Sequence, residues 1–379
     1  MKREIAKRLK LIATEMEEAS LQAMPMGLLG GKLGIALFFM EYSRFRGSDE
    51  YLEKGVGLIE QVFSETAFEI DNFSFYYGMS GLGWLMEYCN EQGFLEADTS
   101  EIFKQNEEML YKRMVFELSR GHYDFLVGGL GIFLYFLAKP ESEKVNAWLT
   151  HGVDLLEDLS IKEGNLISWP DCDFINLQQI QGQRNLGLSH GVPSILVVLC
   201  KAYHSGIDPK RTHRLISMTT DYLLSLSNGD FEDGAIFPSF HIPGTEPERN
   251  SRLGWCYGDL GVCLSLHAAN MILKDRELDN VIKRILAHAA KRRDQIKDKV
   301  NDSALCHGSA GIGHIFNKFA IAYSDPTLKE SADYWFGLSL EQSCGNRIEL
   351  LEGLPGVGLA YISYLKPELA SWEQVLLMA

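Results

Sequence analysis

The stretch LCHGSAGIG, residues 305–313, places a cysteine and a histidine directly before two glycines and an apolar run. The same pattern, G-x-x-G followed by apolar residues, recurs along the chain and begins at Gly31, Gly78, Gly128, Gly191, Gly258, Gly308 and Gly353. In the fourth copy Ser194 replaces the second glycine. Successive copies lie 45 to 67 residues apart, and seven matches to one pattern indicate an internal repeat.

Segments of two kinds flank these turns. The stretches before the glycines are amphipathic: in residues 106–118 and 278–293 apolar residues fall three and four positions apart, which predicts helices. The runs after the glycines are apolar nearly all round, as in helices that are buried on more than one side. Runs of this length also fit buried strands. The alternation of amphipathic and apolar segments favours outer and inner helices.

The repeat predicts a closed ring. An open solenoid needs polar caps, whereas the first and last copies here are as apolar as the middle ones. We therefore predict an all-α fold in which residues 1–379 form a single domain, an α/α toroid (barrel) of seven inner and seven outer helices. The two longest intervals include residues 162–184 and 228–252, which are predicted to form loop insertions or short strands at one rim.

Composition narrows the class of protein. Apolar residues make up 46% of the 379, which is enough to bury a full core. The net charge of −15 argues against nucleic-acid binding, which needs a dense cationic surface. The basic stretch 283–299 has apolar residues at helical spacing, so it indicates a solvated outer helix face.

The chain carries no signal for export or membrane insertion. Its first 17 residues are charged throughout, and no apolar tract reaches the length of a membrane span. We therefore expect a cytoplasmic protein with no transmembrane segment. Its seven cysteines are then expected to be reduced, and a cluster of Cys and His indicates a metal or catalysis rather than a disulfide.

The register of the repeat predicts which residues share one rim, because equivalent positions of equivalent repeats lie at one height. The position before the first glycine holds Gly30, Tyr77, Val127, His190, Tyr257, His307 and Glu352. The position before that holds Leu29, Tyr76, Leu126, Ser189, Cys256, Cys306 and Leu351. Polar and ligand-type residues thus concentrate in the last four copies.

Cys256, Cys306 and His307 are the candidate metal ligands. The two cysteines occupy the same position in adjacent repeats, so they are expected to be neighbours. Adjacent residues diverge by about 100° within a helix, but Cys306 and His307 can converge at a glycine turn. Two thiolates and one imidazole suit zinc, and three protein ligands are the number found at catalytic sites. The alternative is ordinary burial, which suits a lone cysteine better than three residues in register.

The remaining ligand-type residues lack this register. We expect core packing for two histidines within apolar runs, His267 and His314, although helical spacing could aim them at the site. We expect core or loop positions for the other cysteines, which are Cys89, Cys172, Cys200, Cys263 and Cys344.

Four further residues are candidates for catalysis. His190 occupies the rim position in the fourth copy and has an ordinary pKa near neutrality, which suits proton transfer. Asp124, four residues before Gly128, could orient a histidine or take part in proton transfer. Arg252 and Tyr257 bracket Cys256, and Arg252 could stabilise a developing oxyanion. The alternatives are capping or packing for His190 and Asp124, and a surface salt bridge for Arg252.

These residues carry a resemblance to the LanC-like family, the lanthionine synthetases or lantibiotic cyclases. The motifs are Trp255-Cys256-Tyr257-Gly258, Cys306-His307-Gly308 and Ser189-His190-Gly191, with Asp124 ahead of the third turn, and the resemblance runs through all seven turns. It implies a zinc-bearing α/α toroid that cyclises modified peptides. The family's zinc ligands fall on Cys256, Cys306 and His307, and its catalytic or proposed catalytic positions fall on Asp124, His190, Arg252 and Tyr257.

The resemblance implies lantibiotic biosynthesis: a peptide cysteine adds to dehydroalanine or dehydrobutyrine and forms a (methyl)lanthionine thioether ring. Zinc would lower the pKa of the substrate thiol, and His190 would protonate the enolate with help from Asp124, while Arg252 stabilises the oxygen. The implied partners are a dehydrated precursor peptide, a separate dehydratase, since the chain has no extension of dehydratase size, and an export or modification complex.

Two other classes of function stay open. A LanC-like zinc protein could bind glutathione or another thiol, or add it to dehydroamino acids of damaged proteins, without cyclising a peptide. A toroid glycosidase or epimerase would need paired acids at the mouth, for which the rim offers only Glu352 and Asp259.

Overall fold

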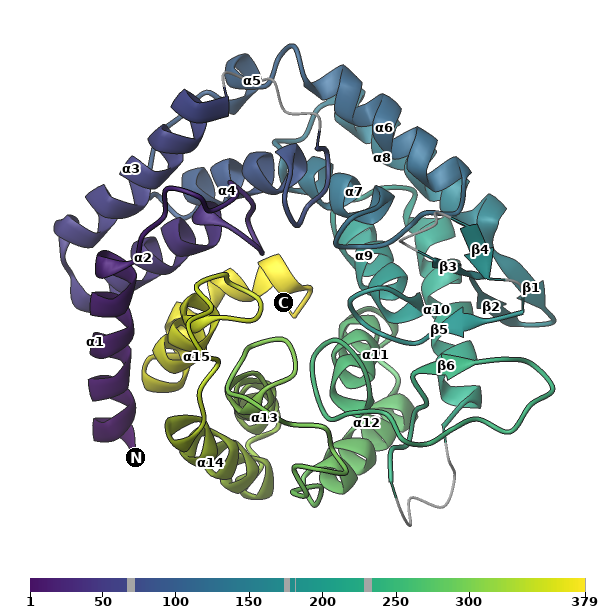
Figure 1. Cartoon of the computed structure of the whole chain (residues 1–379). Coiled ribbons are helices and arrows are strands. Elements are labelled where there is room, and N and C mark those ends of the chain that lie inside the picture. Colours follow the sequence, from purple (N-terminus) through teal and green to yellow (C-terminus); the bar gives the residue numbers. More distant parts are fainter. Residues whose placement is uncertain (67–71, 174–177, 181, 228–233, 379) are drawn as a thin grey trace.

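The protein forms a ring of helices in two layers (Figure 1). The computed structural model describes residues 1–66, 72–173, 178–180, 182–227 and 234–378. Within these ranges the inner layer has seven helices: α2 (Lys32–Arg46), α4 (Met79–Glu91), α7 (Gly129–Ala138), α9 (Val192–His204), α11 (Asp259–Leu273), α13 (Ser309–Tyr323) and α15 (Leu354–Leu365). Each begins directly after the first glycine of a turn.

The outer layer surrounds this ring. Apart from the short α5 (Thr99–Ile102), its seven helices within the described ranges are α1 (Lys2–Glu18), α3 (Asp49–Thr66), α6 (Glu107–Ser119), α8 (Glu143–Leu159), α10 (Pro209–Ser225), α12 (Arg276–Ala289) and α14 (Pro326–Glu341). The ring closes where α15 packs against α1 and α2. The predicted toroid of seven inner and seven outer helices is thus confirmed, and the apolar runs are helices rather than strands. That residues 1–379 form a single domain stays a prediction.

No helix in the described ranges combines the length and the apolar character that crossing a membrane requires.

The glycines of these turns make room for backbone. A Cβ on Gly311, the second glycine of its turn, would lie 1.9 Å from the Leu305 carbonyl oxygen, and a Cβ on Gly308 would lie 2.6 Å from that of Asp302. The Asp302 carbonyl in turn accepts the N–H of Ser309, the first residue of α13, at 2.9 Å. The close approach that excludes a side chain therefore also caps the inner helix.

Four outer helices, α8, α10, α12 and α14, begin differently, because side chains cap them. Ser and Asp residues accept N–H groups of the first turn, as is usual for helix N-caps. They are Ser142, Asp208, Asp275 and Asp325.

Backbone hydrogen bonds join neighbouring turns around the face on which the turns lie, which we call the turn face. The N–H of Leu29 donates to the Tyr76 carbonyl at 3.2 Å, and that of Tyr76 donates to the Leu126 carbonyl at 2.9 Å. On the other side, Cys306 donates to Leu351 at 3.0 Å and Leu351 donates to Leu29 at 3.1 Å. All five occupy the same repeat position, so these bonds hold equivalent residues at one height.

Apolar side chains fill the ring directly beneath these bonds. The position three residues before the first glycine has no exposed surface in any copy, and burial of such side chains stabilises the fold. The seven residues are Leu28, Phe75, Phe125, Leu188, Trp255, Leu305 and Leu350.

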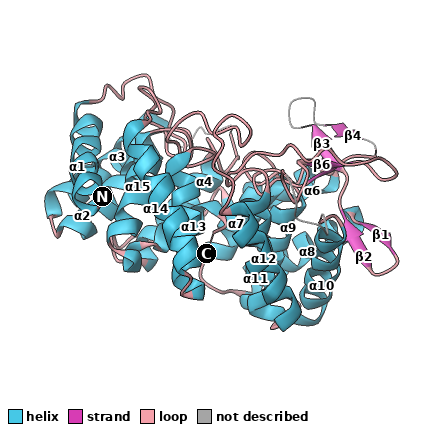
Figure 2. Cartoon of the chain, turned by 90° about the horizontal axis from the view of Figure 1, so that it is seen from below, coloured by secondary structure: helices cyan, strands magenta, loops and turns pink. Residues whose placement is uncertain are grey.

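The insertions form three short antiparallel pairs. These are β1 (Ile161–Glu163) with β2 (Leu166–Ser168), β3 (Asp171–Asp173) with β4 (Gln178–Ile180), and β5 (Arg184–Asn185) with β6 (Phe240–His241). Figure 2 shows β3, β4 and β6 beside the loops of the turn face, as predicted. The β1–β2 hairpin instead packs on the outer helix α10, which corrects the placement of that part of the insertion at the rim. Residues 174–177, 181 and 228–233 of the two insertions lie outside the described residues.

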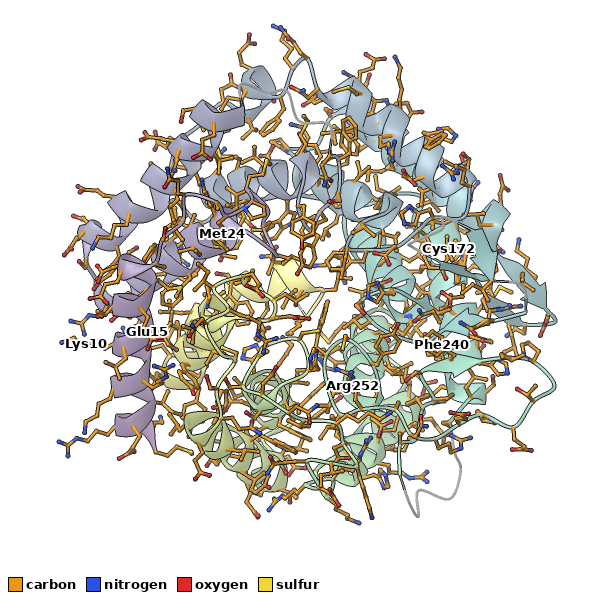
Figure 3. All side chains as sticks on the ribbon, viewed as in Figure 1. Lys10, Glu15, Met24, Cys172, Phe240 and Arg252 are labelled. Carbon is orange, nitrogen blue, oxygen red and sulfur yellow. The ribbon has the colours of Figure 1, made fainter. Side chains whose placement is uncertain are left out.

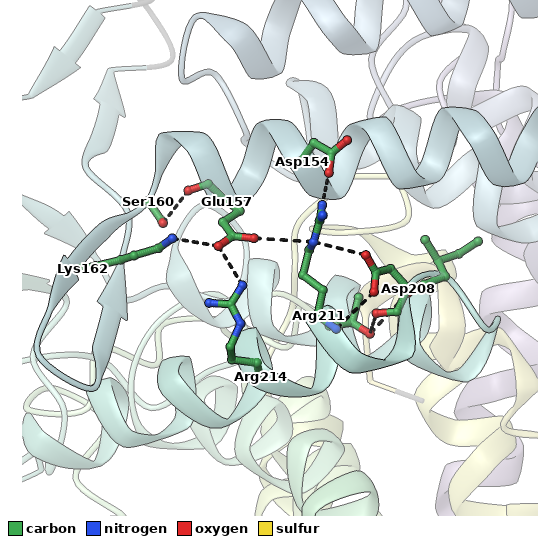
Figure 4. A network of polar contacts seen from close by, with 9 residues as sticks. Asp154, Glu157, Ser160, Lys162, Asp208, Arg211 and Arg214 are labelled. Atoms are coloured by element: carbon green, nitrogen blue, oxygen red, sulfur yellow. Dashed lines mark hydrogen bonds and ion pairs between the residues drawn. The ribbon is translucent and has the colours of Figure 1, made fainter.

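A network of charged side chains ties this hairpin to α8 and α10 (Figure 4). Glu157 accepts from Lys162 at 2.7 Å and from Arg214 at 2.8 Å, and Arg211 contacts Asp154 and Asp208. Apart from Glu157, these side chains are 32% to 48% exposed, so each pair contributes on the order of 0–1 kcal/mol.

We predict that Gly311→Ala destabilises the fold by roughly 2–4 kcal/mol, because the added methyl overlaps the Leu305 carbonyl that lies against α13. Gly337→Ala is the matched control: nothing lies within 4 Å of a Cβ there, inside α14, so it should leave stability unchanged or raise it by about 0.5–1 kcal/mol. Urea unfolding measures both, and equal stability of the two variants would contradict this account of the turn.

Candidate functional site

Two neighbouring turns bring Cys256, Cys306 and His307 together. The N–H of Trp255 donates to the Cys306 carbonyl at 3.0 Å, which joins the start of α11 to the start of α13. One ligand atom from each of the three residues lies within 4.8 Å of the others. Among the described residues this is the only such group of three or more His, Cys, Asp or Glu side chains.

The chemistry of these three residues fits a metal ion. Nδ1 of His307 is buried and has no hydrogen-bond partner among the described residues, which is costly unless a ligand occupies it. The other two donors are thiols, and sulfur with imidazole is the donor set that zinc prefers. The residues therefore fit zinc, and three protein donors leave a position for a further ligand.

The two thiols shift each other's pKa in opposite directions, so Cys306 retains its proton more strongly than Cys256 does. The hydrogen bond with Cys306 lowers the pKa of Cys256 well below its ordinary value; burial opposes this, and His307 and Arg252 reinforce it. The same contact, followed by burial, raises the pKa of Cys306. A divalent cation would take the place of the proton on Cys306, because bound thiols are deprotonated.

His190 and Asp124 form a pair at the joint between the third and fourth turns. His190 Nδ1 lies 2.6 Å from Asp124 Oδ2, and Asp124 Oδ1 accepts the N–H groups of Leu126 and Val127 at 2.7 and 2.9 Å. Burial lowers the pKa of His190, but the charge of Asp124 and its hydrogen bond outweigh burial, so this pKa lies above its ordinary value. The pair therefore orients the imidazole and keeps it protonated to higher pH.

Tyr257 lies next to His190 on the turn face, and the centroids of the two rings are 6.2 Å apart. Asn185 Nδ2 donates to the Tyr257 hydroxyl at 3.2 Å, while Asn185 Oδ1 accepts the N–H of Gly187 at 2.9 Å. The bond from the Gly187 N–H identifies which end of the Asn185 amide is the oxygen. The other end, which faces Tyr257, is therefore the NH₂ group, and the Tyr257 hydroxyl accepts its hydrogen bond. The hydroxyl proton is therefore available to a group other than Asn185.

Arg252 is half-buried, and Figure 3 labels it over the inner layer, beside α11. It forms no ion pair within the part of the chain that the structure describes, so the surface salt bridge is not formed there. After the Cys306 contact and burial, its charge is a further cause of the low pKa of Cys256. The positive charge of the guanidinium thus stabilises the deprotonated form of Cys256.

Sequence reasoning missed Asn185, Asp171 and Phe240. Asn185 had a usable signal, because its position six residues before the first glycine holds Asn72 and Asp302 in other copies. All three side chains accept the N–H of the residue two positions later.

Asp171 lies in an insertion, so the repeat gives no information about it. Burial raises its pKa, and hydrogen bonds from Gln183 and Asn185 partly offset that rise.

Phe240 packs against Tyr257 with ring centroids 5.7 Å apart, and 41% of it is exposed (Figure 3). It lies on β6 in the second insertion, where no repeat register exists. Its exposed ring gives the mouth an apolar wall next to Tyr257.

The two acids considered for a glycosidase each pair with an arginine. Asp259 is fully buried, forms an ion pair with Arg292 at 2.9 Å and accepts the N–H groups of Ile236 and Phe237. Glu352 pairs with Arg347 at 3.3 Å. Asp259 thus anchors the second insertion through the N–H groups of Ile236 and Phe237. Because each of the two carboxylates is paired with an arginine, the contacts disfavour catalysis by a pair of acids.

The remaining histidines and cysteines lie outside the metal cluster. His267 packs against Phe319 and Tyr323, and His314 is buried within α13. Of the other cysteines, four are buried and Cys172 is partly exposed. These positions agree with the predicted core and loop roles.

Comparisons with known proteins agree with this architecture. A family model described as "Lanthionine synthetase C-like protein" matches residues 22–377. Among solved structures, a nisin cyclase superposes with a TM-score of 0.76 and 18% sequence identity, over 100% of this chain and 97% of that chain. At this identity the likeness concerns the fold alone. No curated protein matches the chain in sequence.

Alanine at Cys256 or His307 should abolish tight zinc binding, because two ligands remain where three were present. Cys263→Ala is the matched control: it removes a fully buried thiol of α11 that lies outside the cluster, and it should bind zinc as the parent does. Metal analysis after dialysis against zinc measures the bound ion. Retention of zinc by both cluster variants would contradict the assignment.

Proposed function

Because the chain belongs to the lanthionine synthetase C-like family, we propose that it is a zinc-dependent lanthionine synthetase. In this proposal it adds cysteine thiols of a dehydrated, ribosomally made peptide to dehydroalanine or dehydrobutyrine residues of the same peptide. Each addition forms one C–S bond and closes a (methyl)lanthionine ring.

One observation carries the proposal: a metal-type cluster and a histidine–carboxylate pair share the turn face. The cluster suits activation of a thiol, and the pair suits proton transfer. A thiol addition to an activated double bond needs both, because the thiol must lose a proton and the carbon next to the carbonyl must gain one.

Cys256, Cys306 and His307 would hold the zinc ion, which when bound lowers the pKa of a substrate thiol. The other residues would serve the acceptor. As sulfur attacks the β-carbon, the electron pair of the double bond moves toward the carbonyl oxygen, and the α-carbon then takes a proton. His190 Nε2 would supply that proton, since Nδ1 is held by Asp124.

Arg252 and Tyr257 would stabilise the enolate oxygen. Arg252 supplies a positive charge at the cluster, and the Tyr257 hydroxyl has its proton available because Asn185 occupies its acceptor side. Donors that are already oriented before the charge develops lower the barrier most.

The proposal also names the setting. The peptide would arrive dehydrated from a separate dehydratase, in the cytoplasm where free thiols persist, within an export or modification complex or alone. Phe240, exposed beside Tyr257, would face an apolar part of that peptide.

We expect the purified protein with zinc to consume the free thiols of a dehydrated precursor peptide. Cyclisation leaves the mass of the peptide unchanged, so alkylation of residual thiols followed by mass spectrometry counts the rings. His190→Asn should keep the zinc but lower the rate by roughly 10²–10⁴-fold, because proton transfer is lost. Cys263→Ala should cyclise as the parent does. Full cyclisation by the metal-free His307→Ala variant would refute the proposal, and zinc binding without cyclisation of any precursor would favour a thiol-binding adaptor.

Asp124→Asn should move the alkaline limb of the pH–rate profile to lower pH. His190 must be protonated to act as the acid, so activity falls as pH rises through its pKa, which Asp124 raises. Without that charge, burial dominates and lowers this pKa. The profile of kcat/KM against pH measures the shift, and an alkaline limb in the same place would show that His190 is not the acid.

A further inference from the structure

Residues 371–378 fill the centre of the ring. After α15 the chain passes through two short 3₁₀ helices, η1 (Pro367–Leu369) and η2 (Ser371–Leu376), and Figure 1 shows it ending in the middle of the toroid. Trp372, Val375 and Leu376 have no exposed surface. We call residues 371–378 the central segment; it forms a floor that the inner helices surround.

Trp255 joins this floor to the metal-type cluster. Its indole N–H donates to the Leu376 carbonyl at 2.8 Å, and the side chain is fully buried. Trp255 directly precedes Cys256, and its backbone N–H donates to the Cys306 carbonyl at 3.0 Å. One residue thus contacts the central segment with its side chain and the two thiol-bearing turns with its backbone.

A second set of contacts fixes the central segment to α13, the helix that follows His307. Glu373 forms ion pairs with His314 at 2.9 Å and with Lys318 at 2.6 Å. Burial by itself would raise the pKa of Glu373, but these two partners hold the pKa below its ordinary value, so the carboxylate is charged. The central segment is therefore attached to Trp255, which precedes Cys256, and to α13, which follows His307.

We propose that the central segment sets the geometry of the metal site, with Trp255 as the positioning residue. The Leu376 carbonyl fixes the indole, and the indole fixes the backbone that presents Cys256 to Cys306 and His307. Residues that contact the ligands of a metal, and not the metal itself, commonly hold those ligands in position. Their loss weakens metal affinity by about 10–100-fold. This inference rests on the zinc site of the proposed function, and it adds residues far from the turn face to that site.

The test compares two indole hydrogen bonds. Trp255→Phe removes the bond to Leu376, while the control Trp169→Phe removes an indole bond of 2.7 Å to the Leu156 carbonyl, equally buried but in the first insertion. Zinc affinity is measured on the full chain by competition with a chromophoric chelator, and Co²⁺ substituted for zinc reports the ligand geometry through its absorption spectrum. Urea unfolding reports the stability of each variant.

We expect Trp255→Phe to weaken zinc binding about 10–100-fold and to alter the Co²⁺ spectrum, and Trp169→Phe to change neither, although both lose stability. Glu373→Gln, which leaves every turn intact, should weaken zinc binding in the same direction and serves if Trp255→Phe fails to fold. Parental affinity in Trp255→Phe, or in Glu373→Gln where Trp255→Phe does not fold, would overturn the inference and leave the proposed function standing. Absence of zinc binding in the parent protein would overturn the proposed function itself.

Discussion

The hydrogen bonds between backbone groups of neighbouring turns are the constraint on which the site depends. Apart from the bond from Trp255 to Cys306, these bonds join the same position of neighbouring repeats, so residues at that position lie at one height on the turn face. Cys256 and Cys306, 50 residues apart in the chain, become neighbours for this reason. The glycines serve the same arrangement, because side chains at Gly308 or Gly311 would displace the loop carbonyls that pack against the start of the inner helix.

The joint between the third and fourth turns departs from this pattern. The N–H of Leu126 binds the carboxylate of Asp124 instead of a carbonyl in the next turn, and the other carboxylate oxygen binds His190. The regular backbone pairing of the other turns is thus replaced here by contacts of a histidine–carboxylate pair, and at the next joint the Ser189 hydroxyl, at 3.4 Å, reaches the Cys256 carbonyl. Such local departures are expected at functional positions, because a site must trade regular backbone pairing for a specific side-chain geometry.

The distribution of charge explains why thiol chemistry suits this mouth better than acid catalysis. Asp259 pairs with Arg292 and holds a loop, whereas the guanidinium of Arg252 acts on the sulfurs. The cluster is closed from below by the central segment, whose buried Glu373 is paired with His314 and Lys318. Glu373 beneath the cluster therefore has its partners within the core, whereas His190 and Asp124 pair with each other at the turn face.

The toroid, its count of seven inner and seven outer helices, and the convergence of Cys256, Cys306 and His307 could be predicted from the sequence alone, because one local pattern repeats and equivalent positions in a repeat share one height. Insertions have no register, so the packing of β1–β2 on α10 and the approach of Asp171 and Phe240 to the site followed only from the tertiary structure. The position of the central segment beneath the cluster also followed only from the tertiary structure. The bond between Trp255 and Leu376 joins residues 121 positions apart through the centre of the ring, and the local spacing of residues carries no information about such a contact.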